Sequence, residues 1–165
     1  MIILFYGQPA AGKTTLADEL YSRLSTAIYN LYTTLTNPVE LTEFKFIRID
    51  GDKWRDVTNN KDYSKEGRNL NLKGAFNMAL YLENEGFIPI LSFVTPYDEL
   101  REYLKSNSKN LVQIYLEYEG DRGRNKNFAQ DFEEPNDYNL KINTTYRTIS
   151  DCVDEVVEYC GKNFK

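Results

Sequence analysis

The sequence predicts an α/β protein, a three-layer α/β/α sandwich in which helices cover both faces of a mostly parallel sheet. Short apolar runs typical of buried strands alternate with stretches whose apolar residues recur at helical spacing. Strand, helix and strand in succession favour parallel pairing with a crossover helix. With 165 residues, 41% of them hydrophobic and 27% charged, the chain suits one domain with a full core. We therefore expect a single domain over residues 1–165.

The first elements along the chain are predicted from apolar runs and helical periodicity. Ile2–Tyr6 is a continuous apolar run that predicts a buried strand, and Lys13–Leu24 has the apolar spacing of a helix. Residues 25–45 are rich in Thr, Tyr and Asn, and we expect an irregular insertion there. Phe46–Ile49 predicts the second strand.

The same alternation continues to the end of the chain. The polar, glycine-containing segment 118–137 is predicted to form a short lid. Gly86 is a suitable stop for a long helix, and Ser150 is a suitable cap for the last one. The remaining predicted elements are a helix over Ser64–Glu85, a strand over Phe87–Phe93, a helix from Pro96 to about Lys105, strands over Leu111–Leu116 and Leu140–Ile142, and a helix from Ser150 to Gly161.

The segment Gly7-Gln8-Pro9-Ala10-Ala11-Gly12-Lys13-Thr14 lies between the first predicted strand and the first predicted helix. Strand, glycine-bounded loop, Lys-Thr and helix in that order indicate a phosphate-binding P-loop, and with it a P-loop NTPase-type fold. A loop that wraps phosphate oxygens turns its N–H groups inward, and Gly7 and Gly12 allow the necessary dihedral angles. Lys13 can reach the β- and γ-phosphates, and the Thr14 hydroxyl can hold Mg²⁺. The residues expected to bind the nucleotide are Gly7, Ala10, Ala11, Gly12, Lys13, Thr14 and Thr15.

Asp50-Gly51-Asp52 puts two carboxylates after the second predicted strand. Ligands of open parallel sheets bind beyond the carboxyl ends of the strands, where the P-loop and Ser92 also fall. Phosphoryl transfer to an alcohol needs one carboxylate near Mg²⁺ and another near the acceptor hydroxyl. A polar turn, which Asp-Gly also favours, is the alternative. Because the chain contains no histidine, acid–base chemistry must fall to carboxylates, Lys or Tyr.

Arg55, Arg68 and Asn71 follow the acidic pair along the chain. Arg68 and Asn71 are three residues apart, so they share one face of the predicted helix near its start. Two guanidinium groups and an amide can grip an anionic acceptor. A solvated helix face is the alternative interpretation.

Several motifs resemble, in the same order along the chain, those of the adenylyl-sulfate kinases, which use ATP to phosphorylate the 3′-hydroxyl of adenosine 5′-phosphosulfate. Ile49-Asp50-Gly51-Asp52-Lys53-Trp54-Arg55 is similar to the family's Asp-Gly-Asp-Asn segment. The run from Tyr63 to Asn71 is similar to its Phe-Ser…Arg…Asn run, and Ser92-Phe93-Val94-Thr95-Pro96-Tyr97 is similar to its Ser-Phe-Ile-Ser-Pro-Tyr. Phe128 and the stretch Phe132–Pro135 resemble the family's lid-end phenylalanine and aromatic-Glu-x-Pro segment.

The resemblance implies a role for each matching residue. Lys13 and Thr14 would serve ATP and Mg²⁺, with Asp50 near the metal. Asp52 would orient or deprotonate the 3′-hydroxyl, and Ser92 would lie near the transferring phosphoryl group. Core packing is the alternative for the aromatic residues. The further residues implied to bind substrate are Arg55, Arg68 and Asn71 at the phosphosulfate end, Tyr63 and Phe128 around the adenine, and Phe93 and Val94.

The sequence also departs from the family pattern. Lys53 stands where the family has asparagine, and Asp98 where it usually has arginine. The predicted lid lacks a longer Lys-rich segment, and the segment 25–45 is longer than the usual connection. Two alternatives therefore stay open: a P-loop kinase for another acceptor (a nucleoside, nucleotide, modified base or sugar, or nucleic-acid end), and a nucleotide-binding module without catalysis.

Charge and cysteine content narrow the functional classes. The formal net charge of -5 and the pI near 4.9 argue against broad binding to nucleic acid or to an acidic membrane. Cys152 and Cys160 fall in one helical pattern, too far apart for a disulfide within that helix. We expect a reducing cytoplasm, no leader and no membrane span. The expected partners are a small nucleotide substrate and, from the resemblance, a second copy in a homodimer.

Overall fold

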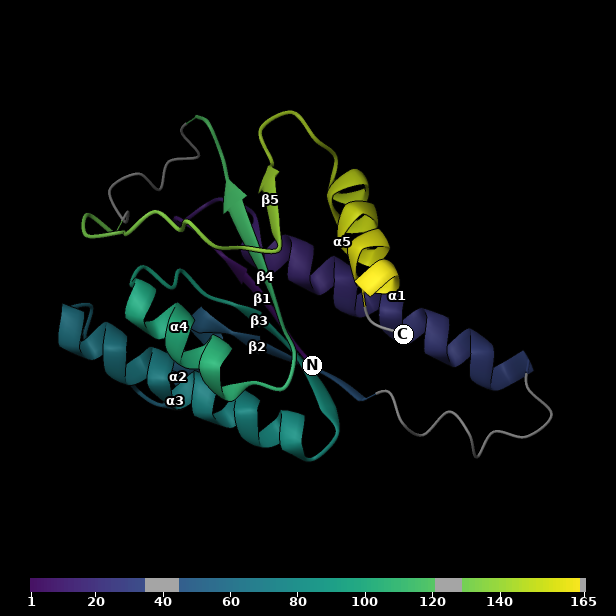
Figure 1. Ribbon diagram of the computed structural model, residues 1–165, viewed down its shortest axis with the longest axis horizontal. Coiled ribbons are helices and arrows are strands. Elements are labelled where there is room, and N and C mark those ends of the chain that lie inside the picture. The colour runs from purple at the N-terminus through teal and green to yellow at the C-terminus, as the bar shows by residue number, and fades with distance from the viewer. Residues whose placement is uncertain (35–44, 121–128, 164–165) are drawn as a thin grey trace.

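The protein is described by a computed structural model over residues 1–34, 45–120 and 129–163. Five strands in these ranges form one sheet in the order β2-β3-β1-β4-β5, and each pair of neighbours is parallel (Figure 1). The predicted parallel α/β architecture is thereby confirmed. The strands are β1 (Ile2–Tyr6), β2 (Lys45–Asp50), β3 (Phe87–Ser92), β4 (Leu111–Glu117) and β5 (Leu140–Asn143).

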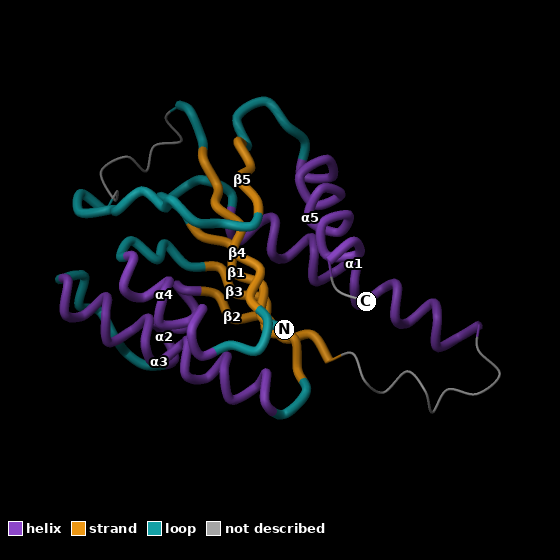
Figure 2. Tube along the Cα trace, in the orientation of Figure 1, coloured by secondary structure: helices purple, strands orange, loops and turns teal. Residues whose placement is uncertain are grey.

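Helices cover both faces of this sheet, which completes the three layers (Figures 1 and 2). Helices α1 and α5 pack together on one face, and α3 and α4 pack together on the other, with α2 beside α3. The helices are α1 (Lys13–Thr34), α2 (Gly51–Val57), α3 (Lys65–Asn84), α4 (Asp98–Asn107) and α5 (Ile149–Asn163).

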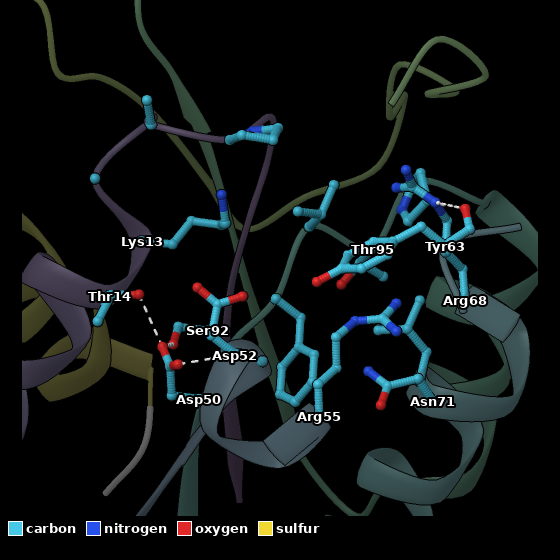
Figure 3. Close-up of a pocket in the computed structure, with 18 of the residues that line it drawn as sticks. Lys13, Thr14, Asp50, Asp52, Arg55, Tyr63, Arg68, Asn71, Ser92 and Thr95 are labelled. Atoms are coloured by element: carbon cyan, nitrogen blue, oxygen red, sulfur yellow. Dashed lines mark hydrogen bonds between the residues drawn. The ribbon is translucent and has the colours of Figure 1, made fainter. Parts of the chain in front are cut away.

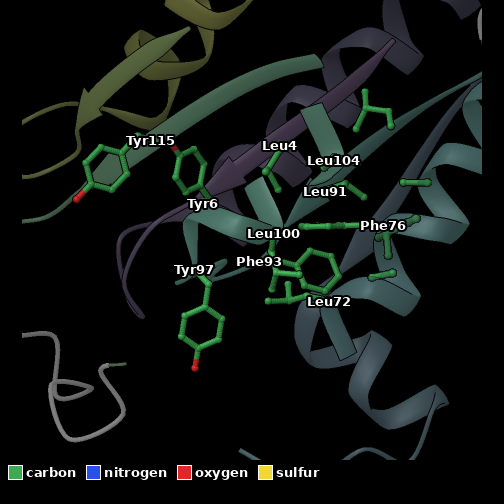
Figure 4. Packing of buried hydrophobic residues seen from close by; sticks show 14 residues of the cluster. Leu4, Tyr6, Leu72, Phe76, Leu91, Phe93, Tyr97, Leu100, Leu104 and Tyr115 are labelled. Carbon is green, nitrogen blue, oxygen red and sulfur yellow. The ribbon is translucent and has the colours of Figure 1, made fainter. Parts of the chain in front are cut away.

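The central strand β1 shows why the sheet is buried on both faces. All its side chains are buried, and they point alternately to the two faces. Ile3 and Phe5 belong to the core cluster under α1 and α5, whereas Leu4 and Tyr6 belong to the cluster under α3 and α4 (Figure 4). A central strand between two helical layers therefore requires a nearly continuous apolar run.

Three predicted helix ends are wrong. Helix α1 continues past Leu24 to Thr34, because neither glycine nor proline interrupts this stretch. The predicted irregular insertion is thus wrong for residues 25–34, while residues 35–44 lie outside the described residues. Helix α5 passes through Gly161 to Asn163, since a single glycine in a last helical turn costs only about 1 kcal/mol. The predicted cap at Ser150 is also wrong, because α5 begins at Ile149 and the Thr148 hydroxyl accepts from the Asp151 N–H.

Two further differences lie beside the candidate site. Helix α2 was not predicted; it begins because the Asp50 carboxylate accepts hydrogen bonds from the backbone N–H groups of Asp52 and Lys53. Helix α4 begins at Asp98 rather than Pro96, because the preceding Tyr97 is extended. Both differences arise in the segment that follows the carboxyl end of a strand, β2 for helix α2 and β3 for helix α4.

The fold brings the predicted functional segments to one edge of the sheet. The P-loop follows β1, Asp50 ends β2 and Ser92 ends β3, and these three strands are adjacent and parallel. Asp50 and Ser92 are register partners. Within the described ranges, no helix has the length and apolar character needed to cross a membrane.

Candidate active site

A cavity of about 890 Å³ opens at the carboxyl edge of β1, β2 and β3 (Figure 3). The P-loop and the acidic pair line one end, and the basic residues of α2 and α3 line the other. Its walls are made by Pro9, Ala10, Gly12, Lys13, Thr14, Thr15, Asp50, Gly51, Asp52, Arg55, Tyr63, Arg68, Asn71, Leu72, Ser92, Phe93, Val94, Thr95 and Pro96.

The P-loop adopts a backbone that few residues other than glycine tolerate. Gly7 has φ 140° and Gly12 has φ 94°, and Ala10 has φ 67°. A Cβ on Gly7 would lie 2.2 Å from the backbone oxygen of Leu116, so the start of the loop lies directly against β4. The Lys13 ammonium donates a hydrogen bond to the Gln8 carbonyl at 2.7 Å, which keeps it over the loop.

Thr14, Asp50 and Ser92 form a hydrogen-bonded group at the start of α1. The hydroxyls of Thr14 and Ser92 both donate to Asp50 Oδ2, at 2.8 and 2.7 Å. Burial alone would raise the pKa of the Asp50 carboxyl, but the hydrogen bonds from Ser92, Thr14 and the backbone of Lys53 and Asp52 leave it below its ordinary value. Asp50 is therefore held as a carboxylate.

Asp52 lies in the first turn of α2, and its position follows from the cap. Asp50 Oδ1 accepts from the backbone N–H groups of Asp52 and Lys53 at 3.1 and 3.3 Å. Asp52 is exposed in the cavity wall, and its carboxylate lies between the P-loop end and the basic end (Figure 3). Exposure and position leave this carboxylate accessible to a ligand.

The basic end is organised around a buried arginine. Arg55 Nη1 donates to the carbonyl and side-chain oxygens of Asn60 and to the carbonyl of Asp62 at 3.2, 3.0 and 2.8 Å. Its guanidinium also lies 4.3 Å from the centre of the Tyr63 ring. Arg68 Nε donates to the Tyr63 carbonyl at 2.9 Å. The two arginines thus hold the loop that presents Tyr63 to the cavity.

Two buried polar atoms in the cavity wall have no hydrogen-bond partner within the described residues, namely Asn71 Oδ1 and Thr95 Oγ1. Thr95 also has φ 46°, which is unfavourable for a β-branched residue. Strained backbone and unpaired buried oxygens are concentrated at ligand sites, because elsewhere both features only destabilise. Sequence reasoning missed Thr95 as a site residue, although Thr95 lies inside the segment Ser92–Tyr97 that resembles the family motif.

A second, smaller cavity of about 150 Å³ lies behind the P-loop. Gly12 and Thr15 line both cavities, so the start of α1 separates them. The Thr144 hydroxyl donates to the Ala11 carbonyl at 3.1 Å and ties the segment after β5 to the P-loop. Sequence reasoning missed this cavity, which is lined by Gly12, Thr15, Leu16, Thr144, Arg147, Thr148, Ile149 and Cys152.

Most of the sequence-predicted site residues lie together in the large cavity. The exceptions are Gly7 and Ala11, which belong to the P-loop but do not line the cavity, and Phe128. Phe128 lies outside the described residues, as do the basic lid residues Arg122, Arg124 and Lys126. Cys152 and Cys160 are both free thiols in α5, as the helical pattern predicted.

Thr14 and Asp50 fit a magnesium ion. Their donors are hydroxyl and carboxylate oxygens, which Mg²⁺ prefers. No group of three metal-ligating His, Cys, Asp or Glu side chains occurs in the described ranges. This sparse set suits Mg²⁺, which is usually held by one or two protein oxygens together with substrate phosphates and water.

Comparison with known proteins agrees with this geometry. The family model described as adenylylsulphate kinase matches residues 1–128. A cytidine diphosphoramidate kinase from Campylobacter jejuni is 29% identical over 117 residues, covering 70% of this chain and 59% of that protein. A probable adenylyl-sulfate kinase from Archaeoglobus fulgidus is 34% identical over 115 residues, covering 69% of this chain and 64% of the relative. This chain therefore matches less than two thirds of the length of either relative.

The solved structures show the same fold. The Mycobacterium tuberculosis APS kinase in complex with AMPPNP and APS is 15% identical, with a TM-score of 0.77, and the match covers 97% of this chain and 96% of that one. At this identity the likeness shows a P-loop kinase-like α/β fold and nothing more specific. The family match covers the P-loop, the acidic pair and the segment that ends in Tyr97, all of which meet at one edge of the sheet. The chain belongs to the adenylylsulphate kinase family.

Proposed function

We propose that this protein is an ATP-dependent kinase that transfers the γ-phosphoryl group to a hydroxyl, and that the 3′-hydroxyl of adenosine 5′-phosphosulfate is its acceptor. The observation that supports this most strongly is the composition of one cavity. A P-loop and a carboxylate pair occupy one end, and two arginines with an unpaired buried amide oxygen occupy the other. These are the groups that an anionic alcohol and a phosphoryl donor need at opposite ends of a shared site.

The two cavities beside the P-loop suggest how ATP binds. The phosphates would lie in the amide-lined loop, with the amino end of α1 pointing at them. The smaller cavity shares Gly12 and Thr15 with the larger one, and it would hold the nucleoside end of ATP. Lys13 would exchange its hydrogen bond to the Gln8 carbonyl for one to a β- or γ-phosphate oxygen.

Thr14 is the residue best placed to hold Mg²⁺. Its proton is committed to Asp50, so the lone pairs of its hydroxyl are free to face a cation. Both oxygens of Asp50 already accept hydrogen bonds, and we infer that Asp50 acts on the metal through Thr14. When bound there, Mg²⁺ would neutralise charge on the phosphate oxygens.

Asp52 would act as the base or orienting group for the acceptor hydroxyl. Its exposed carboxylate lies between the donor end and the acceptor end of the cavity (Figure 3). Ser92, at the end of β3, would hold Asp50 in place beside the transferring group. Catalysis then consists mainly of placement and charge neutralisation, as is typical of phosphoryl transfer.

At the end of the cavity that binds the acceptor substrate, Arg55 and Arg68 would hold the anionic group. The unpaired Asn71 oxygen would accept a hydrogen bond from the substrate, and the Tyr63 ring would stack on its base. A stacking ring favours no particular base. A cytidine diphosphoramidate kinase is among the relatives. A second candidate acceptor is therefore a cytidine nucleotide that carries a diphosphoramidate.

A panel of acceptors tests the proposal. Transfer of labelled phosphate from ATP would be measured with adenosine 5′-phosphosulfate, cytidine diphosphoramidate, AMP and free nucleosides. We expect the highest kcat/KM with adenosine 5′-phosphosulfate. A higher kcat/KM with cytidine diphosphoramidate would make that compound the acceptor in place of adenosine 5′-phosphosulfate. If no hydroxyl accepts phosphate, the protein only binds nucleotide and the proposed kinase activity is wrong.

The Asp52→Asn variant tests the mechanism in the same assay. We expect ATP affinity within about twofold of wild type and turnover lowered about 100-fold or more, because general base catalysis typically contributes that much. Equal turnover would remove Asp52 from the reaction. A homodimer stays a prediction, and sedimentation of the purified protein would test it.

A further inference from the structure

Arg48 is a basic residue in the second half of β2, between Ile47 and Ile49. Its side chain is only 13% exposed and lies behind the large cavity, whose walls it does not line. It points to the same face of the sheet as Asp50, two residues further along the strand. A partly buried guanidinium next to the Asp50 carboxylate needs a physical explanation, because desolvating an arginine is costly unless it is well paired.

Three nitrogens of Arg48 donate to three groups from two other elements. Nε donates to Asp18 Oδ1 in α1 at 2.9 Å. Nη1 donates to the Ile90 carbonyl at 2.8 Å, and Nη2 donates to Ser92 Oγ at 3.2 Å, both in β3. Nη2 also lies 3.9 Å from Asp50 Oδ2. Arg48 therefore joins α1, β2 and β3 at the end that carries the site.

The bond to Ser92 determines where the serine proton points. A guanidinium has donors and no acceptor, so Ser92 Oγ must be the acceptor in that bond. The single hydroxyl proton of Ser92 is then directed to Asp50 Oδ2, where the structure has a 2.7 Å hydrogen bond. Without Arg48, the Ser92 hydroxyl could rotate and donate its proton to an acceptor other than Asp50.

These contacts close into a ring of side chains. Asp18 lies four residues after Thr14 and so on the same face of α1. Thr14 donates to Asp50, Ser92 donates to Asp50, Arg48 donates to Ser92 and to Asp18, and the helix joins Asp18 back to Thr14. A closed ring fixes each member from two sides, so the Thr14 hydroxyl is oriented from outside the cavity.

We propose that Arg48 is a positioning residue for phosphoryl transfer, which fixes the Ser92 hydroxyl on Asp50 and thereby holds Thr14 in the orientation that a magnesium–nucleotide complex needs. This inference rests on the proposed function only in that the P-loop binds a nucleotide with Mg²⁺. It does not depend on which acceptor is used.

Binding of ADP, measured by titration calorimetry with and without Mg²⁺, tests the role of Arg48 apart from activity. In Arg48→Met we expect ADP affinity without Mg²⁺ to match wild type, and affinity with Mg²⁺ to fall about tenfold, as for the loss of one well-oriented polar contact. Arg48→Lys keeps the charge, but its single nitrogen cannot reach all three partners, so we expect a smaller loss in the same direction.

Arg23→Met is the matched control. Arg23 also donates to three groups, Glu19, Asp154 and Ser150, and it joins α1 to α5 away from the cavity. The Arg23→Met variant should be less stable than wild type, but its ADP binding should depend on Mg²⁺ as the wild type's does. If Arg48→Met behaves in the same way, Arg48 is a structural residue and the proposal is wrong.

A double-mutant cycle tests the route through Ser92. Ser92→Ala removes the hydroxyl that Arg48 orients. Adding Arg48→Met to the Ser92→Ala variant should therefore weaken its Mg²⁺-dependent ADP binding by less than about twofold. Fully additive losses would overturn the route. If Arg48→Met does not fold, Arg48→Lys and Asp18→Asn decide, and full wild-type Mg²⁺ dependence in both would refute the proposal. Wild-type protein that binds no nucleotide would instead refute the proposed function.

Discussion

Replacing Gly7 with alanine should strongly destabilise the protein, because the P-loop begins directly against the backbone of β4. The new Cβ would lie 2.2 Å from the Leu116 oxygen and 3.2 Å from the Leu116 carbon, both of which are backbone atoms of β4. A backbone atom in the middle of a sheet cannot move aside as a flexible side chain can. The start of the P-loop must therefore shift away from β4.

The magnitude follows from two costs. Alanine at φ 140° is in a region used almost only by glycine, which costs about 1–3 kcal/mol. Forced displacement of packed backbone costs about another 1–3 kcal/mol. We therefore expect Gly7→Ala to lower the free energy of unfolding by about 2–6 kcal/mol. Nucleotide binding should weaken as well, because the displaced loop carries the amides that hold phosphate.

Gly74→Ala is the matched control. Gly74 lies in the interior of α3, and a Cβ there would make ordinary contact with the Trp54 ring at 3.5 Å. Because alanine is the better helix former, this variant should gain about 0.5–1 kcal/mol. Urea unfolding followed by far-UV circular dichroism would measure both variants. A Gly7→Ala protein as stable as wild type would refute the reasoning about the loop.

Three further variants separate binding, packing and protonation. Arg68→Ala should raise the KM of the acceptor about tenfold or more and leave the KM of ATP within about twofold, as steady-state kinetics would measure. Trp54→Phe removes the 3.1 Å hydrogen bond from the indole N–H to the Asn71 carbonyl, so unfolding by urea should show a loss of about 1 kcal/mol and kinetics a higher acceptor KM. Burial alone would raise the pKa of the Glu83 carboxyl, but hydrogen bonds from the Met1 amino group and from the backbone of Lys109 and Asn110 leave this pKa lowered. The Glu83 carboxylate therefore stabilises the fold above its ordinary pKa of 4.5, and this contribution is lost as the pH falls below that value. Glu83→Gln should therefore be less stable at pH 7 and lose less stability than wild type between pH 5 and pH 3 (roughly the range that spans the carboxylate titration), as urea unfolding at each pH would show.

The sequence predicted those elements whose signals are local. Strand β1 is a short apolar run, and α3 is bounded by Ser64, whose hydroxyl caps the helix through the Gly67 N–H, and by a glycine that follows it. The P-loop was recognisable because its glycines and Lys-Thr pair must occur in a fixed order. For these segments, local conformational preference and the final fold agree.

The elements that the sequence did not predict depend on long-range contacts. Helix α2 has few residues and, besides its local Asp50 cap, depends on packing of Trp54 on Gly74, which no local pattern shows. The partners of Arg48 belong to the same class, since its hydrogen bonds to β3 join strands that are distant in sequence. A basic residue between two apolar ones in β2 was the only local sign of the ring around Asp50.

Asp50 shows why substitutions in this site must be chosen with care. Its carboxylate caps α2 through one oxygen and accepts from Thr14 and Ser92 through the other. An asparagine there would present a single acceptor oxygen, so Asp50→Asn would lose either the cap or the contact with Thr14. A lost cap alone costs about 1 kcal/mol and would move the turn that carries Asp52. Lower activity of Asp50→Asn could therefore arise from a displaced base as well as from a disturbed metal site. The exposed Asp52 carboxylate does not cap α2, so a substitution at Asp52 tests the reacting group itself. A substitution at Arg48 tests the side chains that hold the reacting groups in place.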